Sequence, residues 1–133
     1  MDDFVPSIKV TFYLTGDEFS LEKATKMIGV IPTETRTKDD WPPGGLVCTL
    51  WCIEIKEEYC IAISILFERL LDILDGKTKI LNNLCKEYNL KTSFEVVIHM
   101  KDGDSPEVVL PRKVVSFAAA IDAEIDFDLY CYE

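Results

Sequence analysis

The stretch AIDAEIDFDLYCYE, from Ala120 to Glu133, decides the fold because its polarity alternates with a period of two. Its acidic side chains share one parity: Asp122, Glu124, Asp126 and Asp128. Its apolar side chains share the other: Ile125, Phe127, Leu129 and Cys131. We therefore predict a half-buried closing strand whose apolar side faces helices across a core and whose carboxylates face water.

Two interpretations of the acidic side chains stay open. They form either a solvated face that protects a sheet edge or a surface that docks a basic partner. Catalysis is disfavoured, because a catalytic acid needs a pKa raised by burial and these neighbours are solvated. A metal site is disfavoured as well, because a strand points its side chains in parallel and does not wrap an ion. The sequence predicts no catalytic residue, no metal and no cofactor.

The rest of the chain supplies more strands and several amphipathic helices. Apolar runs predict strands at residues 8–14, 46–55 and 92–100. Helical spacing predicts a helix after Ser20, helices at residues 66–74 and 80–88, and a helix that starts near Pro111. The order is β-α-β-α-α-β-α-β. We predict one α+β domain over residues 1–133, a mixed sheet of about four strands with helices mainly on one face.

Two stretches are less regular. Residues 30–45 contain Pro32, Pro42, Pro43, Gly44 and Gly45, which predict a long loop. Residues 59–65 alternate like a strand at Ile61, Ile63 and Ile65, yet Ile63 also belongs to the helical stripe that follows. The sequence leaves open whether residues 59–65 form a strand or a helix.

The predicted loop carries the second group of candidate partner-binding residues. Arg36, Lys38 and Trp41 either form a contact surface, as loop residues often do, or Trp41 folds back onto the core. Trp51 lies in an apolar strand and is predicted to be core. His99, the single histidine, is predicted to face outward and to act as a surface residue, because no motif places a nucleophile beside it.

Composition narrows the function classes. The net charge of −10 disfavours nucleic-acid binding, which needs clustered Lys and Arg. The N-terminus lacks a signal sequence, and no run reaches the roughly 18 apolar residues of a membrane span, so a cytoplasmic protein without a membrane partner is expected. The five cysteines form no C-x-x-C pair and are expected to be reduced.

Several motifs resemble a bacterial family known only as domain of unknown function 4279. They are Gly16-Asp17-Glu18-Phe19, Ile31-Pro32-Thr33, and residues 108–111 through 121–130 with the closing Asp126-Phe127-Asp128-Leu129-Tyr130. The resemblance covers nearly the whole chain, but Asp39 stands after Lys38 where the family more often has Gly. The resemblance implies a small bacterial cytosolic protein and carries no established activity.

Three function classes follow. The leading one is a non-enzymatic protein-binding module, such as an immunity protein that neutralises a toxin, by analogy with other small acidic proteins. It would bind a basic protein, such as a toxin domain, through the acidic strand together with Arg36 and Trp41. The alternative is a regulatory domain with a small-molecule pocket between sheet and helices. The third class is an enzyme with an unrecognised site. The oligomeric state stays open.

Overall fold

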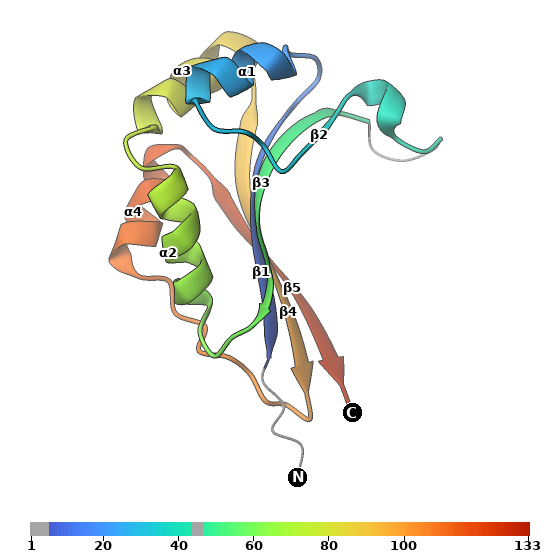
Figure 1. The fold of residues 1–133 in the computed structure, drawn as a ribbon, viewed down its shortest axis with the longest axis vertical. Coiled ribbons are helices and arrows are strands. Elements are labelled where there is room, and N and C mark those ends of the chain that lie inside the picture. The colour runs from blue at the N-terminus through green and yellow to red at the C-terminus, as the bar shows by residue number, and fades with distance from the viewer. Residues whose placement is uncertain (1–5, 44–46) are drawn as a thin grey trace.

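The computed structural model describes residues 6–43 and 47–133, and it places a layer of helices against one face of a sheet (Figure 1). The strands are β1 (Ser7–Gly16), β2 (Glu34–Arg36), β3 (Thr49–Tyr59), β4 (Lys91–Lys101) and β5 (Glu124–Tyr132). The helices are α1 (Leu21–Ile28), α2 (Ile63–Ile73), α3 (Thr78–Tyr88), α4 (Arg112–Ala120) and the short 3₁₀ helix η1 (Lys38–Asp40). The predicted α+β class, with helices on one face, is confirmed.

The strands lie in the order β2-β3-β1-β4-β5. β1 is central and antiparallel to both β3 and β4, whereas β5 runs parallel to β4. A parallel neighbour needs a crossover connection, and α4 supplies it. The sheet is therefore mixed, as predicted, and β2 and β5 form its two opposite edges.

The prediction of about four strands missed a fifth. Residues 30–45 are not one irregular loop, because they contain β2 and η1. β2 pairs with residues 50–52 of β3, from Glu34 opposite Cys52 to Arg36 opposite Leu50. A three-residue strand shows no readable period and exists only because β3 offers it backbone hydrogen bonds. Gly44 and Gly45 of the predicted loop lie outside the described residues.

Two helix ends are capped by side-chain or backbone contacts, and the predicted start after Ser20 is confirmed. Ser20 caps α1, its side chain accepting a hydrogen bond from the Lys23 amide at 3.1 Å. Asn89 ends α3 in the left-handed conformation, with φ of 56°. The ambiguous residues 59–65 divide between two elements, because β3 continues to Tyr59 and α2 begins at Ile63.

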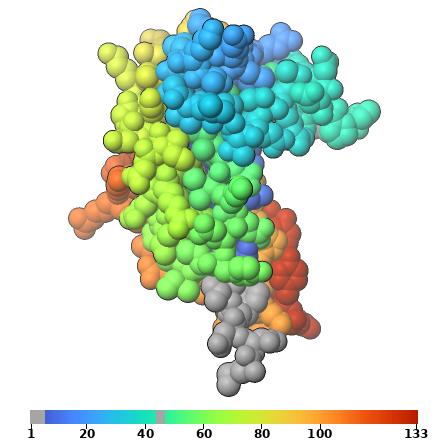
Figure 2. All heavy atoms as spheres, in the orientation of Figure 1, coloured from blue at the N-terminus to red at the C-terminus, as the bar shows by residue number. Residues whose placement is uncertain are grey.

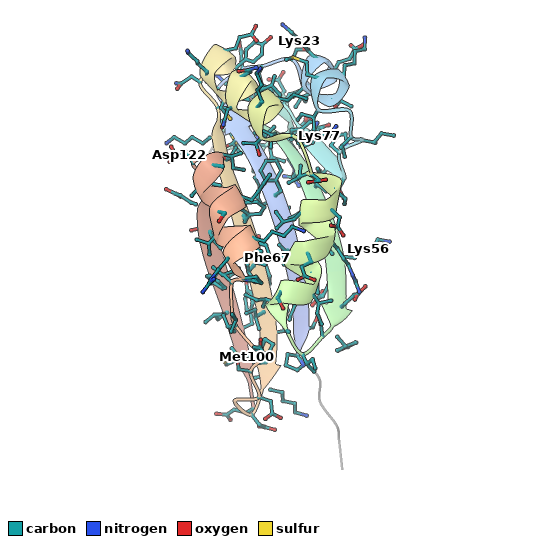
Figure 3. The ribbon with its side chains drawn as sticks, turned by 90° about the vertical axis from the view of Figure 1, so that its left-hand side faces the viewer. Lys23, Lys56, Phe67, Lys77, Met100 and Asp122 are labelled. Atoms are coloured by element: carbon teal, nitrogen blue, oxygen red, sulfur yellow. The ribbon has the colours of Figure 1, made fainter. Side chains whose placement is uncertain are left out.

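The core lies between the sheet and the helices and is rich in aromatic rings. Phe12 of β1 meets Trp51 edge-on at 6.5 Å and Phe94 of β4 at 5.3 Å, measured between ring centroids. Phe67 of α2 (Figure 3) packs against Phe94, with the ring centroids 5.7 Å apart. All four side chains are fully buried, which confirms Trp51 as core. Trp51 also donates its indole N–H to the Thr25 hydroxyl at 3.0 Å.

The apolar side of β5 has the predicted orientation but less burial than a core strand. Ile125, Phe127 and Leu129 pair in register with three buried residues of β4 and so point to the helix side. Phe127 is nevertheless 41% exposed and Leu129 56% exposed. β5 is the outermost strand, so these side chains have strand neighbours on one side only.

This difference predicts unequal losses from the same substitution. Phe94→Ala should lower the free energy of unfolding by about 3–5 kcal/mol, because it removes a fully buried ring and leaves a cavity. Phe127→Ala should lower the free energy of unfolding by less than about 2 kcal/mol, because the Phe127 ring at the sheet edge buries less apolar area on folding than the Phe94 ring does. Urea unfolding of both variants measures the losses. Equal losses would contradict the arrangement of β5 at an open edge.

Candidate functional site

The candidate site is the sheet face opposite the helices, which we name the open face. In Figure 1, α2 and α4 lie to the left of the sheet and α1 and α3 lie at its upper end, whereas η1 is the one helical segment of the described residues at the upper right. The strand register gives the side chains of this face. They include Thr11 and Tyr13 of β1, Glu54 of β3, Glu95 and His99 of β4, and alternate residues of β5 from Glu124 to Tyr132.

Three of the four predicted acidic residues line the open face. Glu124, Asp126 and Asp128 are exposed, on alternate positions of β5, and neighbours of this kind lie about 7 Å apart. Asp122 differs, because it precedes the strand in the left-handed conformation with φ of 54° and so leaves the period of two (Figure 3). Asp adopts this conformation more readily than most residues, which suits the turn after α4. Asp122 still lines a cavity of about 390 Å³ with Glu124 and Asp126.

The register extends the acidic surface across the sheet. Asp126 lies beside Glu95 of β4, Glu95 beside Thr11 of β1, and Thr11 beside Glu54 of β3. We name Glu54, Thr11, Glu95 and Asp126 the acidic row. Like charges on directly paired residues, such as Glu95 and Asp126, are destabilising. The acidic row is therefore a feature that strand pairing by itself does not favour.

The pKa values of two side chains at the middle of the open face are raised. Burial, with Glu95 nearby as the second cause, raises the pKa of Tyr13 to about 12. Burial, followed by the charge of Glu34, raises the pKa of Cys52 to about 11. Both groups stay neutral at physiological pH. Burial, the larger cause, disfavours a charge of either sign at these positions, whereas the neighbouring carboxylates disfavour further negative charge.

A second group of polar residues gathers at the other end of β5. The His99 ring stacks between Tyr130 and Tyr132, with centroids at 4.8 and 5.8 Å. His99 Nδ1 lies 2.9 Å from the Tyr132 hydroxyl, and His99 Nε2 lies 3.6 Å from Glu57 Oε1. A cavity of about 340 Å³ lies at this end and is lined by Ser7, Glu57, Tyr59, His99 and Tyr132.

The Ser7 hydroxyl of this group donates its hydrogen bond to Glu57 and not to the imidazole. The group therefore differs from a Ser–His pair in which histidine activates the nucleophile. The alternation of β4 correctly placed His99 outward. The meeting with Glu57 could not be read from sequence, because it depends on a one-residue register shift between β1 and β3 near Ile8 and Val10.

The predicted contact residues Arg36 and Trp41 lie at the opposite edge from the acidic strand. The Arg36 guanidinium lies 5.0 Å from the Trp41 ring centroid and bonds Glu34 at 2.7 Å. Trp41 is partly buried and donates its indole N–H to the Cys48 carbonyl. Three strands, β3, β1 and β4, lie between β2 and β5. The structure therefore does not bring this pair together with the acidic strand.

Two further features are absent from the described part of the chain. There, no group of three or more His, Cys, Asp or Glu side chains converges as a metal site requires. No helix among residues 6–43 and 47–133 is long and apolar enough to cross a membrane. The core side chains that face the helices from β1 are fully buried.

These features define an α+β domain in which helices cover one sheet face while the other, over the residues that the structure describes, carries the acidic row. Residues 6–132 match the family described as Domain of unknown function (DUF4279), and the chain belongs to this family. Neither the curated proteins nor the solved structures contain a significant match to the chain.

The raised pKa of Tyr13 predicts a pH dependence of stability. Because its folded pKa of about 12 exceeds the unfolded value near 10, Tyr13 contributes stability that is full below pH 10 and is lost as pH rises toward 12. Tyr13→Phe lacks this contribution. Urea unfolding between pH 8 and pH 11 should therefore show wild type losing more stability than Tyr13→Phe. Parallel curves would contradict the partly buried position of the phenol.

Proposed function

We propose that this protein is a non-enzymatic binding module whose open face docks a basic segment of another protein. The observation that carries the proposal is the acidic row, in which Glu54, Glu95 and Asp126 share one sheet face that no helix of residues 6–43 and 47–133 covers (Figure 1). Lys or Arg side chains of a partner would offset the repulsion between Glu95 and Asp126. The same charges would accelerate the encounter with a basic surface.

The aromatic residues beside the acids support a protein partner. Tyr59, Tyr130 and Tyr132 are 77%, 43% and 50% exposed. Tyr is enriched in protein interfaces, where its ring provides apolar area and its hydroxyl provides a hydrogen bond. The acidic row would select a partner of positive charge, and these Tyr rings would provide contact area at one end of the same face.

Within this class we favour a bacterial cytoplasmic immunity protein. An acidic sheet face can block a toxin domain whose active surface is basic, and small size with a net charge of −10 suits that task. Co-expression of this protein with a toxin domain encoded next to its gene should restore growth of the cells that express the toxin. Neutral substitutions of the three acids in the acidic row, Glu54, Glu95 and Asp126, should abolish this protection. Protection that survives loss of the acidic row would place the contact elsewhere.

Contacts of the candidate catalytic groups support a role without catalysis. The Ser7 hydroxyl bonds Glu57 instead of His99, so the group at the end of β5 lacks the Ser–His pair of a histidine-activated nucleophile. The alternative of a small-molecule pocket between sheet and helices is less well supported, because Phe12, Phe67 and Phe94 fill that space.

Removing two charges from β5 tests the proposal. Wild type and the double variant Asp126→Asn/Asp128→Asn are each immobilised on a resin and exposed to a lysate of the source cell. The protein that wild type captures is then purified. The double variant should bind this protein about tenfold more slowly at low salt, with a flatter salt dependence. Its folding stability should be unchanged or slightly higher, because repulsion with Glu95 is relieved.

A matched control removes two charges from another surface. Glu68→Gln/Asp72→Asn changes the net charge equally on exposed positions of α2, which lies on the helix side of the sheet. This control should bind like wild type. Equal slowing in both double variants would show that net charge alone drives the encounter, and an unfolded Asp126→Asn/Asp128→Asn variant would make the acidic strand structural.

A further inference from the structure

The outer edge of β5 is a second feature of the molecule that a partner could use, besides the charged face. β5 spans nine residues, and β4 is its one strand partner in the described part of the chain. The edge strand β2 has three residues by comparison. Figure 2 shows β5 forming the lower right surface of the molecule, below the projecting segment of β2 and η1. Its outward N–H and C=O groups are therefore available to another strand.

The edge is also regular. The register of β5 with β4 runs without a shift from Glu124 to Tyr132. The strand contains no Pro and no Lys, two residues that commonly prevent edge pairing. What it carries instead is negative charge on one face and exposed apolar side chains, Phe127 and Leu129, on the other.

We infer that β5 receives an extended segment of a basic partner as a sixth strand, with Lys or Arg beside the carboxylates and apolar residues beside Phe127 and Leu129. This inference rests on the proposed function and specifies how the basic partner binds. Backbone hydrogen bonds provide the affinity in such strand addition, and alternate side chains provide the specificity. The partner segment alternates basic and apolar residues, because successive side chains point to opposite faces.

The charges of β5 argue against a second copy of this chain as the occupant. Antiparallel pairing of two β5 edges centred on Asp128 would place the two Asp128 side chains opposite each other. Pairing centred on Asp126 would do the same for Asp126 and would also oppose Glu124 to Asp128. Like charges directly opposite are destabilising, so these registers disfavour a second copy, whereas a basic strand meets no such repulsion.

Two peptides of equal composition test the inference on the full chain. Acetyl-KVKTKVK-amide alternates basic and uncharged residues, and acetyl-KKVTVKK-amide does not. The alternating peptide should bind at least about tenfold more tightly by calorimetry, because only it matches both faces of β5. Amide hydrogen exchange should slow on binding at β5 positions that point away from β4.

N-methylation separates strand addition from charge attraction. Two forms of the alternating peptide carry methyl groups on alternate amides, one on odd positions and one on even positions. One form should lose at least about tenfold in affinity, because its hydrogen bonds to β5 are blocked, and the other should bind like the parent. Asp126→Asn/Asp128→Asn should weaken the alternating peptide, whereas Glu68→Gln/Asp72→Asn should not.

The opposite results are distinct from failure of the proposed function. Equal binding of both peptides, with no effect of N-methylation, would overturn strand addition and leave a charged face that docks basic partners. Absence of any peptide binding would overturn the inference, and the captured partner would then test the proposed function separately. Protection of β5 amides that grows with protein concentration, without peptide, would overturn it in favour of a second copy.

Discussion

The rest of the structure depends on the burial of β1 at the centre of the sheet. β1 pairs with β3 on one side and β4 on the other, and its helix-side residues are fully buried: Ile8, Val10, Phe12 and Leu14. Phe12 joins the neighbouring strands by contact with Trp51 and Phe94. Apolar burial on one side of β1 fixes its parity, and a strand of fixed parity also fixes which side chains point to the open face.

The open face follows from this constraint. Once Phe12 points to the helices, Thr11 and Tyr13 must point away, and the register brings Glu54 and Glu95 beside Thr11. The parallel pairing of β5 then adds Asp126 to the same row. The stabilisation from hydrophobic burial on the helix side thus offsets the repulsion among carboxylates on the other side. A face that is held in place in this way is preorganised, which is what the proposed docking of a basic partner requires.

The two sheet edges differ in a way that bears on function. β2 is short and is followed by η1, whose first turn is closed by hydrogen bonds between Thr37 and Asp40. This edge offers little backbone to another chain. β5 is long and regular, and its protection is electrostatic. An edge protected only by charge is selective, because it repels acidic strands and attracts basic ones.

Local sequence determined the elements whose signals are short-range. Ser20 and Asn89 marked helix ends by side-chain or left-handed capping, and the alternation of residues 92–100 and 124–129 fixed which side chains face the core. These properties depend on neighbours within a few positions, so a single sequence displays them. The α+β class followed from the order of such elements.

Tertiary structure alone decided the properties that depend on pairing between distant segments. β2 exists because β3 binds it, Glu57 meets His99 because the β1–β3 register shifts, and Arg36 lies far from Asp126 because their strands occupy opposite edges. The exposure of Phe127 has the same origin, since an alternating strand reads alike at the centre and at the edge of a sheet. Strand order and register are set by the packing of the whole core, and no local pattern records them.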